Sequence, residues 1–221
     1  MGAPAELTMG DFSCAVPDWR ERIMACRSLI PDLPLFEPNA SRAVEIFNSL
    51  HLPDVPGRPL LRDAAGEWQR DLVRAIFGSF DERVNKREIR EFFCMVPKKS
   101  SKTTGGAAIM LTALLMNRRP RAEFLLIAPT LEIADLAFRQ VVGMIETVPV
   151  LKSKFHIQEH LKRITFVDGA KPGAGSFLKV KSFDPRVVTG SKPSGVLIDE
   201  LHVFIGMAQT RRVDWRRMGC R

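Results

Sequence analysis

A basic stretch in the middle of the chain, residues 95–106 (MVPKKSSKTTGG), carries residue types that bind nucleotide phosphates. It lies between an apolar run, residues 92–96, and a helix-like apolar stretch, residues 107–116. A strand, a tight loop and a helix in this order aim backbone N–H groups and a helix N-terminus at phosphate oxygens. The order predicts a phosphate-binding loop in which Lys102 binds the β- and γ-phosphates and the Thr103 hydroxyl binds Mg²⁺.

The spacing within this stretch departs from the usual phosphate-loop pattern, GxxxxGK[ST]. Counting back from Lys102, Val96 and Ser101 stand where that pattern has its two glycines. Any residue supplies a backbone N–H, and glycine is needed only where a side chain would block the approach of the backbone. By spacing alone, a capped helix N-terminus with solvated lysines explains the stretch better than a nucleotide site does.

A second group of chemically useful residues closes an apolar segment, residues 195–200 (GVLIDE). At the end of a strand, Asp199 can reach a Mg²⁺ ion, and Glu200 can orient and deprotonate a water molecule aimed at the γ-phosphate. Taken alone, an Asp–Glu pair at a strand end is as often a solvated turn. Combined with the phosphate loop, and with a strand and a helix between them, the pair is typical of one class of ATPase.

Apolar runs and amphipathic stretches alternate between and around these motifs. The pattern predicts helices over residues 18–30, 41–50, 66–80, 107–116 and 131–148, and strands over residues 92–96, 124–128, 164–167, 177–180 and 195–200. A glycine-rich turn, DGAKPGAG, separates two of the strands as a hairpin turn would. Buried strands that alternate with helices indicate an α/β protein with a parallel sheet.

Four segments together resemble the ATPase domain of tailed-bacteriophage terminase large subunits: GEWQRDLVRAIFG, VPKKSSKTT, FLLIAPTLEIADLAF and VVTGSKPSGVLIDELHVF. The resemblance spans roughly residues 60–204 in consistent order. It implies a P-loop NTPase fold of the ASCE type, with a mostly parallel sheet flanked by helices, and ATP and Mg²⁺ as cofactors. In that family the nucleotide loop is a deviant Walker A motif that begins with a basic residue. Ser101 departs from the family, whose members usually keep a glycine before the lysine.

The resemblance assigns roles to individual residues. Lys102 and Thr103 take the Walker A roles, and Asp199 and Glu200 take the Walker B roles. The implied catalytic residues are then Glu200 and Lys102, and the Mg²⁺ ligands are Thr103 and Asp199. The implied nucleotide-binding residues are Gln69, from the adenine-side motif, and the loop residues Lys98, Lys99, Ser100, Ser101, Lys102, Thr103 and Thr104. Gln69 could equally be a solvated helix residue.

Composition and charge bound the function classes further. Hydrophobic residues make up 45% and charged residues 26% of the chain, as in globular proteins that bury a core. The longest apolar stretch, residues 107–116, is too short to span a bilayer. The four cysteines show no metal-type spacing, which indicates reduced thiols and, with the resemblance, the cytoplasm of a bacterial host. The net charge of +8 supports a polyanionic partner only weakly, because half of it falls in residues 206–221.

For the domain organisation we expect an N-terminal extension with short helices (1–60), a partial ATPase domain (61–205) and a divergent basic tail (206–221). The resemblance implies a motor that moves double-stranded DNA into a procapsid, with the terminase small subunit and the portal as partners and a homo-oligomeric ring as the assembly. After Phe204 the sequence has no apolar run for the next buried strand of the fold. We therefore expect a chain truncated after Walker B and without a nuclease domain, for which ATP hydrolysis and loss of that activity both stay open.

Two other functions stay open at this point. A helicase- or translocase-type P-loop ATPase without a viral role would share the Lys–Thr and Asp–Glu pairs. A non-catalytic remnant would bind nucleotide or DNA weakly. The run VTGSKPSG before the Asp–Glu strand favours the packaging ATPase over the helicase.

Overall fold

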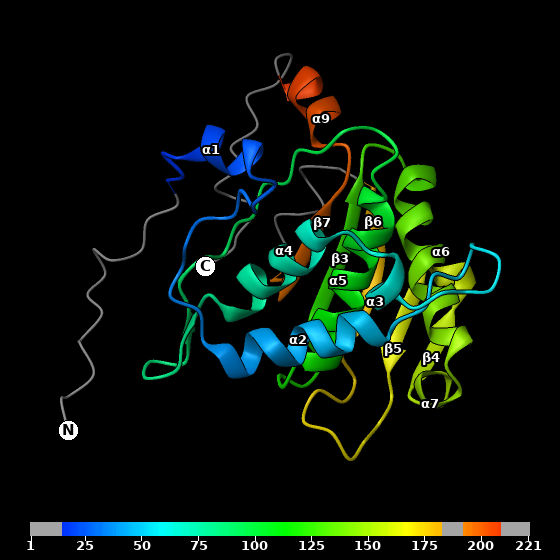
Figure 1. The fold of residues 1–221 in the computed structure, drawn as a ribbon. Coiled ribbons are helices and arrows are strands. Elements are labelled where there is room, and N and C mark those ends of the chain that lie inside the picture. Colours follow the sequence, from blue (N-terminus) through cyan, green and yellow to red (C-terminus); the bar gives the residue numbers. More distant parts are fainter. Residues whose placement is uncertain (1–14, 183–191, 209–221) are drawn as a thin grey trace. The chain divides into compact units, whose positions relative to one another are not determined.

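The structure is a computed structural model that describes residues 15–182 and 192–208 of the 221-residue chain. The chain divides into two compact units, one of residues 1–45 and 66–92, the other of residues 46–65 and 93–221. Figure 1 shows the elements of both. The predicted domain boundaries, after residues 60 and 205, stay a prediction. The first half of the run VTGSKPSG and most of the basic tail lie outside the described residues.

The first unit is helical, with one short hairpin. Its elements are α1 (Trp19–Met24), most of α2 (Glu37–Ser49), α4 (Glu67–Gly78), β1 (Phe80–Asp81) and β2 (Lys86–Arg87). An ion pair of 2.6 Å between Arg74 and Glu37 joins α4 to α2. The predicted helix over 18–30 is wrong beyond Met24. Cys26 takes a left-handed conformation (φ 51°), and the Arg22 guanidinium donates to the carbonyl of Ile30, which folds the chain back.

The second unit contains a five-stranded sheet in the order β4-β5-β6-β3-β7. The strands are β3 (Glu123–Ala128), β4 (Phe155–Gln158), β5 (Arg163–Phe166), β6 (Phe177–Ser182) and β7 (Gly195–Ile198). The predicted α/β class is confirmed. The sheet is mixed, however, because β3 is parallel to both β6 and β7 whereas β4, β5 and β6 pair antiparallel. The predicted hairpin around DGAKPGAG is confirmed as β5 and β6.

Two long helices, α5 (Lys102–Met116) and α6 (Leu131–Thr147), lie side by side on this sheet (Figure 1). α5 packs against β7, and α6 packs against β3 and β6. The shorter helices of the unit are α3 (Leu61–Ala64), α7 (Pro149–Lys152), the 3-10 turn η2 (Glu159–Leu161) and α9 (Leu201–Ala208). Among the described residues, no helix is both long and apolar enough to cross a membrane.

A glycine sets the distance between α5 and β7. A Cβ atom placed on Gly106 would lie 3.0 Å from Cδ2 of Leu197, a tighter approach than most real Cβ contacts. The absence of a side chain therefore lets the first turns of α5 approach the strand that ends in the Asp–Glu pair. This approach brings the two sequence motifs within reach of each other.

The predicted strand over residues 92–96 is wrong. These residues lie in an irregular segment, and the side chains of Phe93 and Met95 are 76% and 84% exposed. In the part of the chain that the structure describes, β7 pairs with β3 on one edge and with no strand on the other. An apolar run becomes a buried strand only where a neighbour satisfies its backbone N–H and C=O groups. Among residues 15–182 and 192–208, no strand pairs with residues 92–96.

Candidate nucleotide-binding site

The predicted phosphate loop is a tight turn without glycine. Lys99 and Ser101 both have left-handed backbones, at φ 67° and 57°. The Ser100 hydroxyl donates to the carbonyl oxygen of Pro97 across 2.7 Å and closes the turn. Such conformations cost about 1–2 kcal/mol in residues other than glycine. The chain thus makes the sharp turn into α5 at a strain that the usual glycines would avoid.

The Asp–Glu pair is placed by the end of β7. The backbone N–H of Asp199 donates to the carbonyl of Ile127 across 2.9 Å, which continues the β7–β3 ladder by one residue. Glu200 then takes a left-handed backbone (φ 54°), and its N–H donates to Oδ1 of Asp199 across 2.9 Å. Left-handed residues other than glycine cluster at functional sites. The turn leaves the Asp199 side chain buried and that of Glu200 partly exposed.

The two motifs meet through three polar contacts. Nζ of Lys102 lies 2.8 Å from Oδ1 of Asp199 and 2.5 Å from Oε1 of Glu200. The hydroxyl of Thr103 donates to Oδ2 of Asp199 across 2.7 Å. Residues that lie nearly a hundred positions apart in the sequence therefore form one cluster. Lys102 and Thr103 stand on the first turn of α5, where unpaired backbone N–H groups point outward.

The cluster fixes the charges of its members. Burial alone would raise the pKa of Asp199, but hydrogen bonds from Lys102 and Thr103 outweigh it and hold that pKa below its ordinary value. Burial alone would lower the pKa of Lys102, and the two carboxylates outweigh it and raise that pKa. At neutral pH the cluster therefore holds one ammonium group and an ionised Asp199.

The chemistry of these donors fits a nucleotide with Mg²⁺. Among the described residues, no group of three or more His, Cys, Asp or Glu side chains could hold a metal ion. Mg²⁺ commonly takes fewer protein ligands than this, because it keeps several waters and binds one or two carboxylates together with substrate phosphates. The Asp199 carboxylate and the Thr103 hydroxyl, 2.7 Å apart, offer oxygen ligands of this kind next to the Lys102 cation.

The other predicted binding residues have less defined surroundings. Lys98 and Lys99 are exposed at the start of the loop, and Thr104 is partly buried in the first turn of α5. Gln69 lies on α4 in the first unit and is only 4% exposed, so it is not a solvated helix residue. Its side-chain oxygen accepts a hydrogen bond from the N–H of Gly66 across 3.2 Å and caps α4. Its adenine-side role stays a prediction.

Two contributors escaped the sequence reasoning. Gly106 was not singled out, although a glycine on the helix after a phosphate loop is a signal for close helix–strand packing. His202 was also missed, and its Nδ1 lies 3.4 Å from Oε2 of Glu200. The available signal was its position two residues after the catalytic candidate, at the turn from a strand into a helix.

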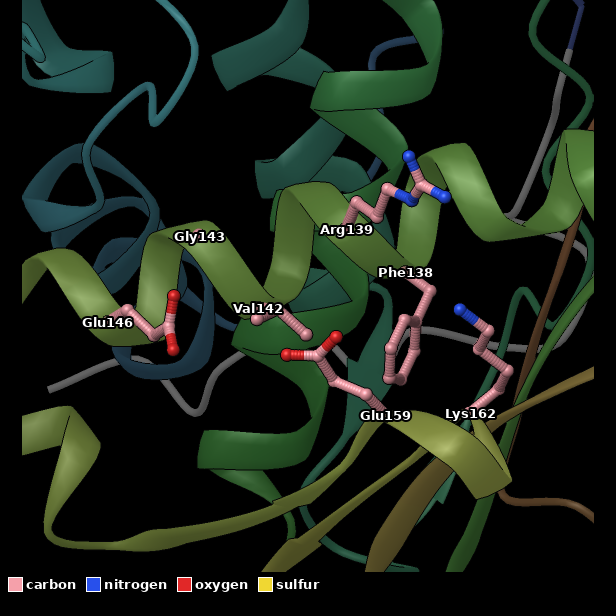
Figure 2. A pocket seen from close by; sticks show the side chains of 7 residues that line it. All are labelled: Phe138, Arg139, Val142, Gly143, Glu146, Glu159 and Lys162. Carbon is pink, nitrogen blue, oxygen red and sulfur yellow. The ribbon is translucent and has the colours of Figure 1, made fainter.

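A separate hollow of about 360 Å³ lies between α6 and the β4–β5 corner (Figure 2). It is lined by Phe138, Arg139, Val142, Gly143, Glu146, Glu159 and Lys162, none of which was predicted as a site residue. Nζ of Lys162 lies 5.6 Å from the Phe138 ring centre and 2.8 Å from the buried carboxylate of Asp135. These contacts hold the connection between β4 and β5 against α6. The residues around the hollow therefore have a role in packing.

Comparison with known families decides the assignment. The family model for the terminase large subunit, ATPase domain, matches residues 67–213, which is more than half of the chain. This chain belongs to the terminase large-subunit ATPase-domain family. Membership implies that the chain uses a nucleotide, and it confirms the predicted family.

The superposition on the HK97 protein supports the fold. The large terminase of bacteriophage HK97 superposes with a TM-score of 0.56 at 17% identity, over 77% of this chain and 35% of that one. The large-terminase ATPase domain of Thermus phage P74-26 gives a TM-score of 0.41 at 24% identity, over 52% of this chain and 49% of that one. The terminase-family chain thus spans about a third of the HK97 protein. No curated protein sequence matches it. The predicted P-loop NTPase fold of the ASCE type is confirmed.

Proposed function

We propose that this chain hydrolyses ATP with Mg²⁺ as the ATPase part of a viral DNA-packaging motor. One observation carries the proposal. The ammonium group of Lys102, at the start of α5, lies within 2.8 Å of both carboxylates that close β7. A cation and two carboxylates converge in this way where a phosphate chain, a metal ion and an attacking water must meet.

Each residue of the cluster has a distinct role in this proposal. Lys102 and the backbone N–H groups at the start of α5 bind the phosphates. Thr103 and Asp199 hold Mg²⁺, which when bound neutralises charge on the phosphate oxygens. Glu200 accepts a proton from the attacking water as general base. Lys98, Lys99, Ser100, Ser101 and Thr104 line the phosphate side, and Gln69 reads the adenine side.

Binding of the nucleotide requires Lys102 to exchange partners. Its Nζ now lies 2.5 Å from Oε1 of Glu200, the carboxylate that must be free to accept a proton. Phosphate oxygens compete for the same ammonium group, because charge-assisted hydrogen bonds to phosphate are among the strong ones. The ammonium group of Lys102 therefore stays paired with the carboxylate of Glu200, the general base, until a nucleotide binds.

The proposal extends to the assembly. Double-stranded DNA is the substrate that is moved, the terminase small subunit and the portal of the procapsid are partners, and several copies form a ring in the bacterial cytoplasm. Residues 61–205 form the ATPase domain in this proposal, with residues 1–60 as an extension and 206–221 as a basic tail. Family membership supports this part.

A second candidate function is nucleotide binding without hydrolysis. It is favoured by the irregular segment 92–96, whose Phe93 and Met95 side chains are exposed immediately before the phosphate loop. A loop anchored on one side by α5 alone is held less rigidly than a loop between a buried strand and a helix. Catalysis is more sensitive than binding to such positioning.

The two candidates are separated by measuring Mg²⁺-dependent phosphate release and ATP binding with the full chain. ATP hydrolysis predicts turnover that Glu200→Gln lowers at least about a hundredfold while ATP binding persists. The matched control is Glu159→Gln, which changes an exposed glutamate on η2 and should leave turnover unaltered. Binding without turnover in the unmodified chain would support the second candidate, and absence of both would contradict the two.

A further inference from the structure

The two carboxylate oxygens of Glu200 have different partners. Oε1 lies 2.5 Å from Nζ of Lys102, and Oε2 lies 3.4 Å from Nδ1 of His202. Lys102 must leave its oxygen when phosphates bind, for the reason given above. The imidazole of His202 faces no such competition, because it contacts the other oxygen. Of the two partners, His202 is therefore the one that nucleotide binding would leave beside Glu200.

The fold fixes the backbone from which His202 reaches Glu200. α9 begins directly after Glu200, and the N–H of Val203 donates to the Glu200 carbonyl across 3.0 Å. Phe204 is completely buried and packs with Leu125 and Ile127 of β3, which anchors the first turn of α9 to the sheet. The His202 side chain itself is 76% exposed. Its backbone is therefore held while its ring stands at the surface beside the carboxylate.

We propose that His202 is a positioning residue for Glu200. Its Nδ1 already lies 3.4 Å from Oε2. With nucleotide bound, this nitrogen donates to Oε2 and leaves Oε1 free to take the proton of the attacking water once Lys102 has moved to the phosphates. A glutamate side chain has several rotamers, and a base contributes fully only when its oxygen is within hydrogen-bond reach of the proton it accepts. This inference rests on the proposed hydrolysis of ATP at the same site.

A purely structural role for His202 has different consequences. Pairs between exposed side chains contribute little to folding. Loss of the His202 contact should therefore leave the thermal midpoint unaltered, and it should leave ATP affinity unaltered because the contact of His202 is with Glu200, which is not a phosphate-binding residue in this proposal. A positioning role predicts that kcat alone falls.

Two substitutions of His202 separate these roles. His202→Phe keeps a ring of similar size but removes the donor, and we expect kcat for ATP to fall at least about tenfold with KM and thermal midpoint unaltered. His202→Asn places an amide N–H near the former Nδ1, and we expect it to recover most of the lost kcat. The matched control is His160→Phe, which changes an exposed histidine on η2 and should have no effect.

Each result has a defined reading. An unaltered kcat in the His202→Phe variant overturns the positioning role and leaves the proposed hydrolysis intact. Equal losses of kcat in the Phe and Asn variants, or a parallel fall in thermal midpoint, overturn it as well. If the unmodified chain binds ATP without turnover, the proposed hydrolysis is contradicted. The role of His202 then falls as well, because it rests on that hydrolysis.

Discussion

Thr103, at the start of α5, donates its hydroxyl proton to Oδ2 of Asp199, which follows β7 ninety-six residues later in the chain, across 2.7 Å. A hydroxyl and a carboxylate in contact form a ready pair of oxygen ligands for a hard cation. The same contact helps hold Asp199 in its ionised form. Binding chemistry and local stability therefore depend on one hydrogen bond.

Removal of the Thr103 hydroxyl should weaken Mg²⁺ binding. Thr103→Val keeps the shape of the side chain and removes the oxygen, and we expect the Mg²⁺ concentration for half-maximal ATP binding to rise at least about tenfold. Thr103→Ser keeps the hydroxyl and is the matched control. The measurement is a Mg²⁺ titration of ATP affinity, with no turnover required. Identical titrations for the Val and Ser variants would contradict Thr103 as a ligand.

Glycine at position 101 should stabilise the protein. Ser101 has a left-handed backbone (φ 57°) that glycine adopts without strain, so Ser101→Gly should raise the free energy of unfolding by about 0.5–1 kcal/mol. The neighbouring Ser100 lacks a positive φ and donates to Pro97, so Ser100→Gly should lower it by about 1 kcal/mol. Urea denaturation measures both. Shifts in the same direction would show that backbone strain at Ser101 is not the deciding factor.

The Asp199 cluster predicts a loss of stability in acid. Its pKa is depressed in the folded chain, so its contribution is complete well above the ordinary aspartate value, about 3.9, and is lost as pH falls through the depressed value. Asp199→Asn should flatten the fall in the free energy of unfolding between about pH 5 and pH 2. Asp63→Asn, an exposed aspartate on α3, should leave the fall unaltered. If the free energy of unfolding falls equally steeply with pH in both variants, Asp199 is not the cause of the loss of stability in acid.

The close approach of α5 to β7 should depend on the size of residue 106. Gly106→Ala adds a Cβ against the flexible end of Leu197, and the gain in helix propensity offsets the crowding, so stability should change by less than about 1 kcal/mol. Gly106→Val should lower the free energy of unfolding by about 2 kcal/mol, since overpacking shifts the helix. It should also weaken ATP binding, as Lys102 is displaced from Asp199. Thermal unfolding and ATP titration measure the two effects.

The sequence predicted the cluster of Lys102, Thr103, Asp199 and Glu200 because their chemistry is useful only when they meet. Some elements were predicted from the pattern of their own residues: α4, α6 and β3 begin and end within two residues of the prediction, whereas α5 begins five residues before it. Such patterns are local, and the physical cause of each element lies within its own residues.

Features that depend on distant neighbours could not be predicted. Residues 92–96 carry the composition of a strand, but a strand needs a partner edge, and the sequence does not show where that edge lies. β4 was missed because Phe155–Gln158 alternates apolar and polar residues over only four positions. The contact of His202 with Glu200 depends on the left-handed backbone of Glu200, which no residue type at that position signals.

The central claim is that Lys102 binds nucleotide phosphates at this cluster, and ATP affinity tests it most directly. The measurement is equilibrium binding of ATP with Mg²⁺ to the unmodified chain, to Lys102→Gln and to Lys152→Gln, an exposed lysine on α7, with thermal midpoints recorded for each. The account predicts that Lys102→Gln weakens binding at least about a hundredfold while Lys152→Gln binds as the unmodified chain does. Equal affinity of a folded Lys102→Gln variant and the unmodified chain would contradict it.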